Sequence, residues 1–297
     1  MTTMSRHTPT PSEDTPGNPA QWNRVWEGGQ PQLFTRGSLK TVSQLSQRGY
    51  FEDLWACMGE RAPMAKYLEL GSGRGTTSMY LANRGCDVTL ADLSGEALKQ
   101  AEANFQREGL ERPKTVVADA RDSGLPPRTF DCIYNIGLLE HFEDPRPVLR
   151  ETVRLLRPGG LGFMVIVPEI PNHRSWLPQL LFCPWRPFVD ESRRWARRLL
   201  GRGQLQTAST ILRTSYQRQQ YETWMREAGT AGDWCSCSPY NPYHRVYMSE
   251  LLERWVLVPC YTAHHRLHQR HPRMRTWNSV AQCDLLLYRK SEDSPPE

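Results

Sequence analysis

The segment from Lys66 to Gly75 constrains the fold of this chain more than any other. Residues 66–70 are a short, mostly apolar run of strand length, and glycines follow at positions 71, 73 and 75. A helix is predicted next, at 77–83. A glycine turn between a strand and a helix lets the backbone bend sharply and approach a ligand closely. The segment therefore predicts a strand–turn–helix unit with a nucleotide-like ligand at its turn.

The alternation of strand and helix continues to residue 167. Further strands are predicted at 87–91, 115–118, 130–135 and 161–167, and helices at 95–108 and 145–156. Repeated units of this kind place their strands side by side in a parallel sheet, with helices on both faces. We predict an α/β fold, doubly wound around a mostly parallel seven-stranded sheet.

The pattern changes after Pro168. Prolines, a basic helix predicted at 192–200 and a helix predicted at 205–228 replace the alternation. A helix at 248–254 and strands at 255–261 and 282–288 are predicted to resume it. We therefore expect a helical cap inserted after the fifth strand, and a sheet that is completed by residues beyond the cap.

These patterns divide the chain into six segments. Residues 1–20 are rich in Thr, Pro and Ser and lack the apolar stretch of a secretion signal, so a disordered leader is expected. The remaining segments are an N-terminal helical cap segment (21–60), a Rossmann-like core (61–171), the inserted cap (172–247), the completion of the core (248–290) and a disordered tail (291–297).

Composition excludes several classes of protein. Hydrophobic residues make up 38% and charged residues 23% of the chain, which suits a core with a solvated surface. The longest apolar run, 161–167, is too short to span a bilayer. Eight scattered cysteines without an export signal argue against disulfides, so we expect reduced thiols and a cytoplasmic protein. Cys235-x-Cys237 with His244 resembles only half of a metal site, so no metal is expected.

Charge is distributed unevenly. The formal net charge is +5, and the residues after 171 contain 18 basic and 11 acidic side chains. The arginines between 193 and 198 are predicted to form one basic face of a helix. This face could bind phosphate, a carrier protein or anionic lipid, and the alternative interpretation is a solvent-exposed face without a partner. The sequence shows no pattern typical of an RNA-binding module, so we do not expect nucleic acid as a partner.

The glycine turn resembles that of one enzyme family. A dinucleotide-binding turn requires glycine where this chain has Thr76. The sequence Glu69-Leu-Gly-Ser-Gly-Arg-Gly75 instead resembles motif I of the class I S-adenosylmethionine-dependent methyltransferases, and the order of strands and helices is similar from 66 to 167. The resemblance implies S-adenosylmethionine as methyl donor and methyl transfer as the activity.

The resemblance also implies roles for individual residues. Glu69 would order the glycine turn beneath the methionine part of the donor, and Asp92 would accept hydrogen bonds from both ribose hydroxyls. Leu93 would lie near the adenine, Asp119 would bind the adenine edge, and Asn135 would face the methionine end. The donor-binding residues predicted in this way are Glu69, Gly71, Ser72, Gly73, Gly75, Asp92, Leu93, Asp119, Ala120 and Asn135.

Three residues are candidate catalytic bases. His141 follows the fourth strand, and Glu169 and His173 follow the fifth, at the edge where open α/β sheets bind their ligands. Loop packing for His141 and solvent exposure for the other two are the alternative interpretations. Methyl transfer can also rely on positioning alone, so a dedicated base is not required.

We predict transfer of a methyl group to oxygen or nitrogen of a small molecule by direct displacement. The many aromatic residues of the inserted segment suit an apolar or aromatic acceptor, although ordinary packing explains many of them. The alternatives are a protein or RNA methyltransferase that docks its substrate on the arginine helix 193–198, and a donor-binding scaffold without catalysis. The identity of the acceptor and the oligomeric state stay open.

Overall fold

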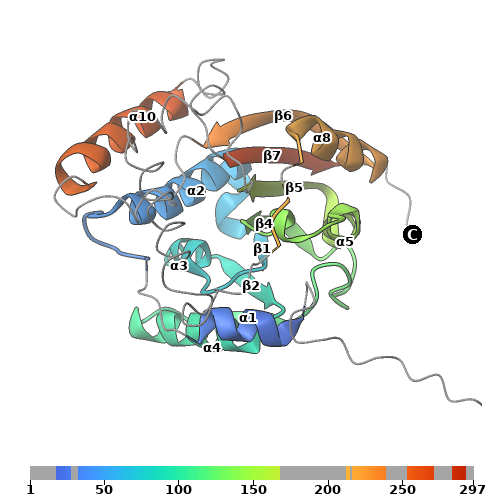
Figure 1. The fold of residues 1–297 in the computed structure, drawn as a ribbon, viewed down its shortest axis with the longest axis horizontal. Coiled ribbons are helices and arrows are strands. Elements are labelled where there is room, and N and C mark those ends of the chain that lie inside the picture. The colour runs from blue at the N-terminus through green and yellow to red at the C-terminus, as the bar shows by residue number, and fades with distance from the viewer. Residues whose placement is uncertain are drawn as a thin grey trace, which may run out of the picture.

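The computed structural model describes residues 18–27, 33–167, 212–214, 216–238, 253–270 and 283–291. Its centre is a seven-stranded sheet with the strand order β3-β2-β1-β4-β5-β7-β6 (Figure 1). Strands β1 to β5 pair in parallel, and β7 runs antiparallel to both of its neighbours. The predicted α/β fold with a mostly parallel sheet is confirmed. The strands are β1 (Lys66–Leu70), β2 (Asp87–Asp92), β3 (Lys114–Val117), β4 (Phe130–Ile136), β5 (Leu156–Ile166), β6 (Thr230–Ser238) and β7 (Cys283–Lys290).

Helices cover both faces of the sheet, as predicted (Figure 1). One face is covered by α2 (Val42–Met58), α3 (Thr76–Ala82) and α4 (Gly95–Arg107), and the other by α5 (Arg146–Leu155) and α8 (Arg218–Glu227). Helix α10 (Val258–Arg270) packs against α2, and α1 (Pro19–Trp26) packs against α4. None of the helices in these described ranges has both the length and the apolar character needed to cross a membrane.

The central strands are buried on both faces because each alternates side chains between two apolar layers. Tyr67 packs in the layer with α2 and α3, whereas Leu68 packs in the layer with α5 and α8. Gly162 in β5 is opposite Tyr288 in β7, and a Cβ atom at Gly162 would lie 2.0 Å from the ring of Tyr288. The missing side chain therefore lets the tyrosine ring pack against the neighbouring strand.

Two predictions for the C-terminal half were wrong. The strand predicted at 255–261 is helical, within the π-helix η5 (Glu253–Leu257) and the start of α10. The sheet is completed by β6 instead, which lies inside the segment predicted as a cap, as does the core helix α8. Short apolar runs occur in helices as well as in strands, so the local pattern could not decide between them.

The predicted cap is accordingly shorter than 172–247 at its C-terminal end. Helix α8 begins at Arg218, although a helix was predicted from residue 205. Its Tyr221 and Met225 are each 1% exposed and pack in the core rather than above it. Residues 168–211, which include Glu169, His173 and the arginine segment 193–198, lie outside the described residues, as do most of the predicted leader and tail.

Candidate functional site

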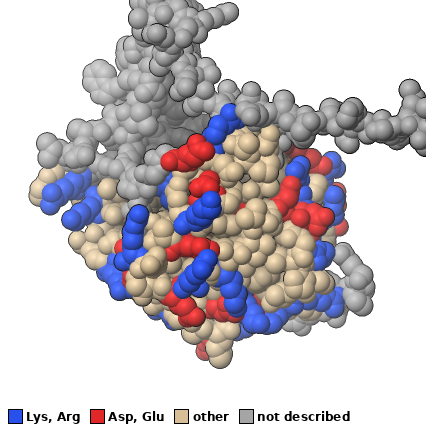
Figure 2. All heavy atoms as spheres, turned by 90° about the horizontal axis from the view of Figure 1, so that it is seen from below, with Lys and Arg blue, Asp and Glu red and all other residues tan. Residues whose placement is uncertain are grey.

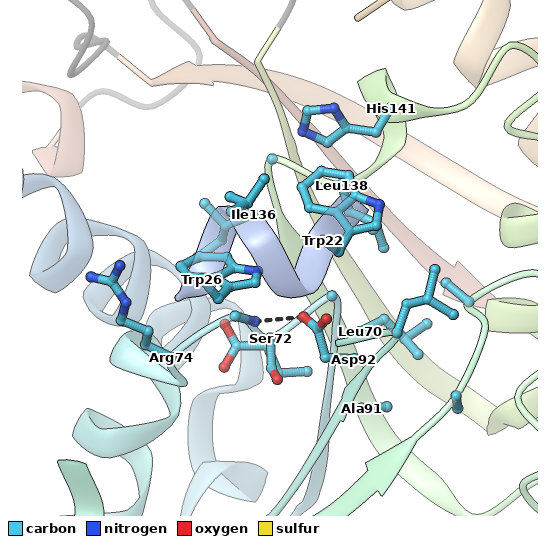
Figure 3. Close-up of a pocket in the computed structure, with 18 of the residues that line it drawn as sticks. Trp22, Trp26, Leu70, Ser72, Arg74, Ala91, Asp92, Ile136, Leu138 and His141 are labelled. Atoms are coloured by element: carbon cyan, nitrogen blue, oxygen red, sulfur yellow. Dashed lines mark hydrogen bonds between the residues drawn. The ribbon is translucent and has the colours of Figure 1, made fainter. Parts of the chain in front are cut away.

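A cavity of about 390 Å³ lies where β1, β2, β3 and β4 end (Figure 3). The turns after these strands form its floor and sides, and α1 and Arg213 add further walls. A volume of this size suits a small organic ligand. Most of the donor-binding residues predicted from the sequence meet here, together with one candidate base. They are Glu69, Gly71, Ser72, Gly73, Asp92, Leu93, Asp119, Ala120 and His141.

Two predicted donor-binding residues do not line the cavity. Gly75 precedes α3 with a φ of +63°, and a Cβ atom there would lie 2.9 Å from Leu90 Cδ1 in the core. Asn135 is fully buried in β4, one residue before the cavity wall begins, and neither atom of its amide group has a hydrogen-bond partner among the described residues. Both residues lie behind the cavity rather than in its wall.

The glycine turn is fixed by backbone hydrogen bonds and closely covered by side chains. The Gly71 N–H donates to the Ala91 carbonyl at 2.8 Å, which ties the end of β1 to β2. A Cβ atom at Gly71 would lie 2.6 Å from Leu138 Cδ1, and one at Gly73 would lie 2.8 Å from the Trp26 ring. Both glycines have positive φ, so a side chain would strain the turn as well as collide.

Asp92 connects the turn to the end of β2. Its Oδ2 accepts the Gly73 N–H at 2.8 Å (Figure 3). Its Oδ1 accepts the Ser94 N–H at 2.8 Å. The side chain is buried, which raises its pKa although these N–H groups partly oppose the shift. A carboxylate offers about four acceptor positions, so Asp92 retains acceptor capacity for a ligand in the cavity.

Asp119 follows β3, the strand next to β2, and its carboxylate is in a different environment from that of Asp92. The Arg121 guanidinium forms a bidentate ion pair with this carboxylate, with Nη2–Oδ2 and Nε–Oδ1 distances of 2.6 and 3.0 Å. Partial burial acts to raise the pKa of Asp119, but the hydrogen bonds from Arg121 outweigh it and lower the pKa below its ordinary value. Asp119 is therefore a more exposed and already compensated carboxylate.

Glu69 supports the floor of the cavity from below. It is 5% exposed, and its Oε2 accepts from Ser78 Oγ at 2.6 Å and from the Tyr134 hydroxyl at 3.2 Å. Burial raises the pKa of Glu69 to about 7. Beside it in the turn, the Ser72 hydroxyl is buried and has no hydrogen-bond partner among the described residues. The turn thus presents polar groups that a ligand could satisfy.

His141 occupies the other end of the cavity and is held in one orientation. Its Nδ1 lies 2.8 Å from the Leu212 carbonyl oxygen, and its ring meets Trp22 edge to face with 4.9 Å between centroids (Figure 3). A carbonyl oxygen only accepts, so Nδ1 carries the proton and Nε2 keeps its lone pair. Burial, together with the charge of Arg213, lowers the pKa of His141 to about 4.

This lowered pKa makes protein stability depend on pH. An unfolded histidine takes up a proton near pH 6.5 and folded His141 does not, so stability is lost as the pH falls below 6.5. Between pH 7.5 and 5 we expect His141 to contribute a loss of about 2 kcal/mol in the free energy of unfolding. Urea unfolding of the wild type and of His141→Gln at both pH values measures this change in the free energy of unfolding. Equal pH dependence of the two proteins would contradict the assignment.

Sequence reasoning missed several residues of the cavity wall. Trp22 and Trp26 lie one helical turn apart in α1, and this spacing was the available signal that one face of the helix covers something apolar. Hydrogen bonds hold α1 in place, from Ser94 Oγ to Asn23 Oδ1 at 2.6 Å and from Gln100 to the Trp26 carbonyl. Arg213 lies inside the segment predicted as a cap and has no local signal. The other lining residues that were not predicted include Val25, Leu33, Gln47, Arg74, Leu138 and Phe142.

Comparison with known proteins identifies the class. A family model described as a methyltransferase domain matches residues 68–164. The ubiquinone biosynthesis O-methyltransferases of Thiobacillus denitrificans and Nitrosomonas europaea are 29% and 30% identical to the chain, over 64% and 62% of its length and 75% and 71% of theirs. The crystal structure of a candidate sarcosine dimethylglycine methyltransferase from Galdieria sulphuraria shares the fold, with a TM-score of 0.56, 17% identity and coverage of 91% and 97% of the two chains.

The chain belongs to the class I S-adenosylmethionine-dependent methyltransferases. The cavity fits this methyl donor on three observations. Its volume suits a ligand of that size, and the buried Asp92 carboxylate in its wall has remaining acceptor capacity. The glycine turn brings to the wall the buried Ser72 hydroxyl, which has no hydrogen-bond partner among the described residues. In the described part of the chain, no three His, Cys, Asp or Glu side chains are grouped to hold a metal ion.

Proposed function

We propose that this protein transfers a methyl group to a hydroxyl oxygen of a small molecule. The observation that carries the proposal is the arrangement at His141. A neutral imidazole, with its proton fixed on Nδ1 by the Leu212 carbonyl, lines the same cavity as the donor-binding turn. A neutral Nε2 is suited to accept the proton of a hydroxyl as that oxygen is methylated. The name of the two curated relatives, O-methyltransferase, supports oxygen as the acceptor atom.

The donor site divides by chemistry along the cavity. We assign the ribose hydroxyls to the remaining acceptor positions of Asp92, and the adenine edge to Asp119 and Ala120. The glycine turn would lie beneath the methionine part, with Glu69 bracing it through Ser78. When bound, the donor supplies an electrophilic methyl group on a sulfonium. The residues of the chain align the acceptor with it, exclude water and receive the acceptor's proton at His141 Nε2.

The wall around His141 suits a small apolar or aromatic acceptor. Trp22 lies against the His141 ring, Leu138 and Phe142 also line the cavity, and aromatic surfaces pack favourably against a planar ring. Helix α1 covers the cavity, so a compact acceptor fits this space better than a polymer. Figure 2 shows acidic and basic side chains interspersed on one face of the molecule rather than a continuous basic stripe, which gives nucleic acid no supporting feature there.

Methyl transfer from a ¹³C-methyl-labelled donor tests the proposal. The full chain is incubated with labelled S-adenosylmethionine and small-molecule, protein and RNA fractions of cell extract. We expect label in the small-molecule fraction, with the carbon chemical shift of a methyl ether or ester. A shift typical of an N-methyl group would refute oxygen as the acceptor atom. Label confined to protein or RNA would refute the small-molecule class and favour docking on the arginine segment 193–198.

A further inference from the structure

A second cavity, of about 210 Å³, lies at the other edge of the sheet from the donor cavity. Its wall includes Ala65 just before β1, Asp131 near the start of β4 and Arg157 near the start of β5. Arg289, near the end of the antiparallel β7, is opposite Leu161 and so lies at the same edge. The donor cavity is at the carboxyl ends of the parallel strands, so the two cavities are at opposite ends of these strands.

Three of the residues that line this second cavity are arginines, and one is an acid. Arg61, in the short helix η1 (Gly59–Met64), joins Arg157 and Arg289, and Asp131 is the acid. The other lining residues carry no charge and are Met58, Met64, Ala65, Pro158 and Gly160. Three cations and one anion give the lining a formal charge of +2.

The Asp131 carboxylate compensates one of the three arginines. Arg157 Nη1 donates to its Oδ1 at 2.9 Å and to its Oδ2 at 3.2 Å. The Lys66 N–H also donates to Oδ2, at 2.8 Å, so both carboxylate oxygens are already engaged. Asp131 therefore neutralises Arg157 and leaves the charges of Arg61 and Arg289 to be compensated by something else.

Arg289 and Arg61 have no carboxylate partner among the described residues. Arg289 is half-buried and donates to the backbone carbonyls of Gly159 and Cys57, at 3.3 and 3.5 Å. These distances are longer than is usual for N–H···O hydrogen bonds. The Arg61 side chain is exposed and has neither a hydrogen bond nor an ion pair within the described ranges. By contrast, Arg121 pairs with a carboxylate.

Uncompensated guanidinium groups in a hollow favour an anion with several acceptor oxygens. A guanidinium presents its N–H donors in a planar fork that matches two oxygens of one phosphate. A phosphate group carries about −1.5 to −2 charges at pH 7, which complements a lining of +2 better than a single carboxylate does. The cavity is smaller than the range of about 300 to 1,000 Å³ typical of drug-sized ligands, so it suits a phosphate group rather than a whole nucleotide.

We propose that this second cavity binds a phosphate group, either free inorganic phosphate or the phosphate of a small organic ester. Arg289 and Arg61 are the residues that contact its oxygens, and Arg157 adds positive charge from its position beside Asp131. The inference goes beyond the proposed methyl transfer, because it assigns a second class of ligand to a cavity that shares no lining residue with the donor cavity.

Calorimetric titration of the full chain at constant ionic strength tests the assignment. The probes are inorganic phosphate and glycerol 3-phosphate, because both present phosphate oxygens and only the second has an organic part. We expect Arg289→Gln to weaken binding of both probes by about tenfold or more, the range for hydrogen bonds to a charged group. Arg61→Gln should weaken it by about two- to fivefold, because Arg61 is exposed. Tighter binding of glycerol 3-phosphate would support the site and favour an ester as its ligand, and tighter binding of inorganic phosphate would support it and favour the free anion.

Arg36→Gln is the matched control, because Arg36 also donates to a backbone carbonyl, that of Glu108, and lines neither cavity. It should leave the phosphate affinity unchanged. Equal losses in all three variants would show a general effect of charge and overturn the assignment. Unchanged affinity in Arg61→Gln and in folded Arg289→Gln, checked by its thermal unfolding, would overturn it as well.

Two further results bear on the second cavity itself. The wild type should bind the probes equally well with and without saturating S-adenosylhomocysteine, since the two cavities are separate. Competition between phosphate and S-adenosylhomocysteine would place the phosphate in the donor cavity and overturn the proposal. So would the absence of binding of either probe at concentrations up to about 10 mM. Neither result depends on methyl transfer, so the proposed function stands or falls separately.

Discussion

Replacing His141 with Gln is expected to lower kcat by about 10²- to 10⁴-fold, the usual contribution of a general base. Glutamine can still donate to the Leu212 carbonyl and fill the space beside Trp22, but it has no basic nitrogen. The affinity for S-adenosylhomocysteine should stay within about threefold of wild type, since His141 lies at the acceptor end. Single-turnover rates with saturating donor, together with calorimetry, measure the two effects separately.

A matched control comes from another histidine. His265 in α10 lies beside Glu52 in α2, and neither residue lines the cavity. His265→Gln should therefore keep the wild-type rate. A kcat for His141→Gln close to that of wild type would show that positioning alone drives the reaction. A loss of donor affinity as large as the loss of rate would indicate that His141 supports the loop instead.

Asp92→Ala is expected to weaken donor binding by about 100-fold or more. The substitution removes the proposed ribose contact and also the acceptor for the Gly73 and Ser94 N–H groups, each at 2.8 Å. Hydrogen bonds to a charged group contribute about 1.5 to 3 kcal/mol each, and a buried donor left without a partner adds its own cost. Calorimetry with S-adenosylhomocysteine measures the loss, and thermal unfolding confirms that the variant is folded.

Asp119→Ala provides the comparison within the same cavity. Asp119 is more exposed and already neutralised by Arg121, so its removal should weaken binding by about tenfold or less, as expected for a solvated contact. The order of the two effects is the informative result. Equal losses for both variants, or a larger loss for Asp119→Ala, would contradict the assignment of Asp92 as the central donor contact.

The donor end of the site was predictable because short sequence segments determine it. Three glycines after an apolar strand specify a turn with positive φ, and parallel strands bring their carboxyl ends to one edge. Asp92 and Asp119 therefore lie in the cavity because each stands at or just after the carboxyl end of a parallel strand. Gly75 was assigned to the ligand although it accommodates Leu90, since sequence does not show which glycine faces the core.

The remaining walls depend on contacts between distant segments. A helical segment was predicted at 21–60, but the position of α1 over the glycine turn follows from the contact of Trp26 with Gly73 and of Asn23 with Ser94. Arg213 reaches the cavity because residues 212–214 bind the turn after β4, where the Thr214 N–H donates to the Glu140 carbonyl at 2.7 Å. Strand β6 was missed for the same reason, because pairing with β7 defines it and local composition does not.

A crystal structure with S-adenosylhomocysteine tests the central claim most directly, that this cavity holds the donor with its reacting end toward His141. The account predicts the ribose hydroxyls on the Asp92 carboxylate, the adenine beside Asp119 and the sulfur atom facing the space next to His141 Nε2. A ligand bound elsewhere on the molecule, or one in the cavity with its sulfur turned away from His141, would contradict it.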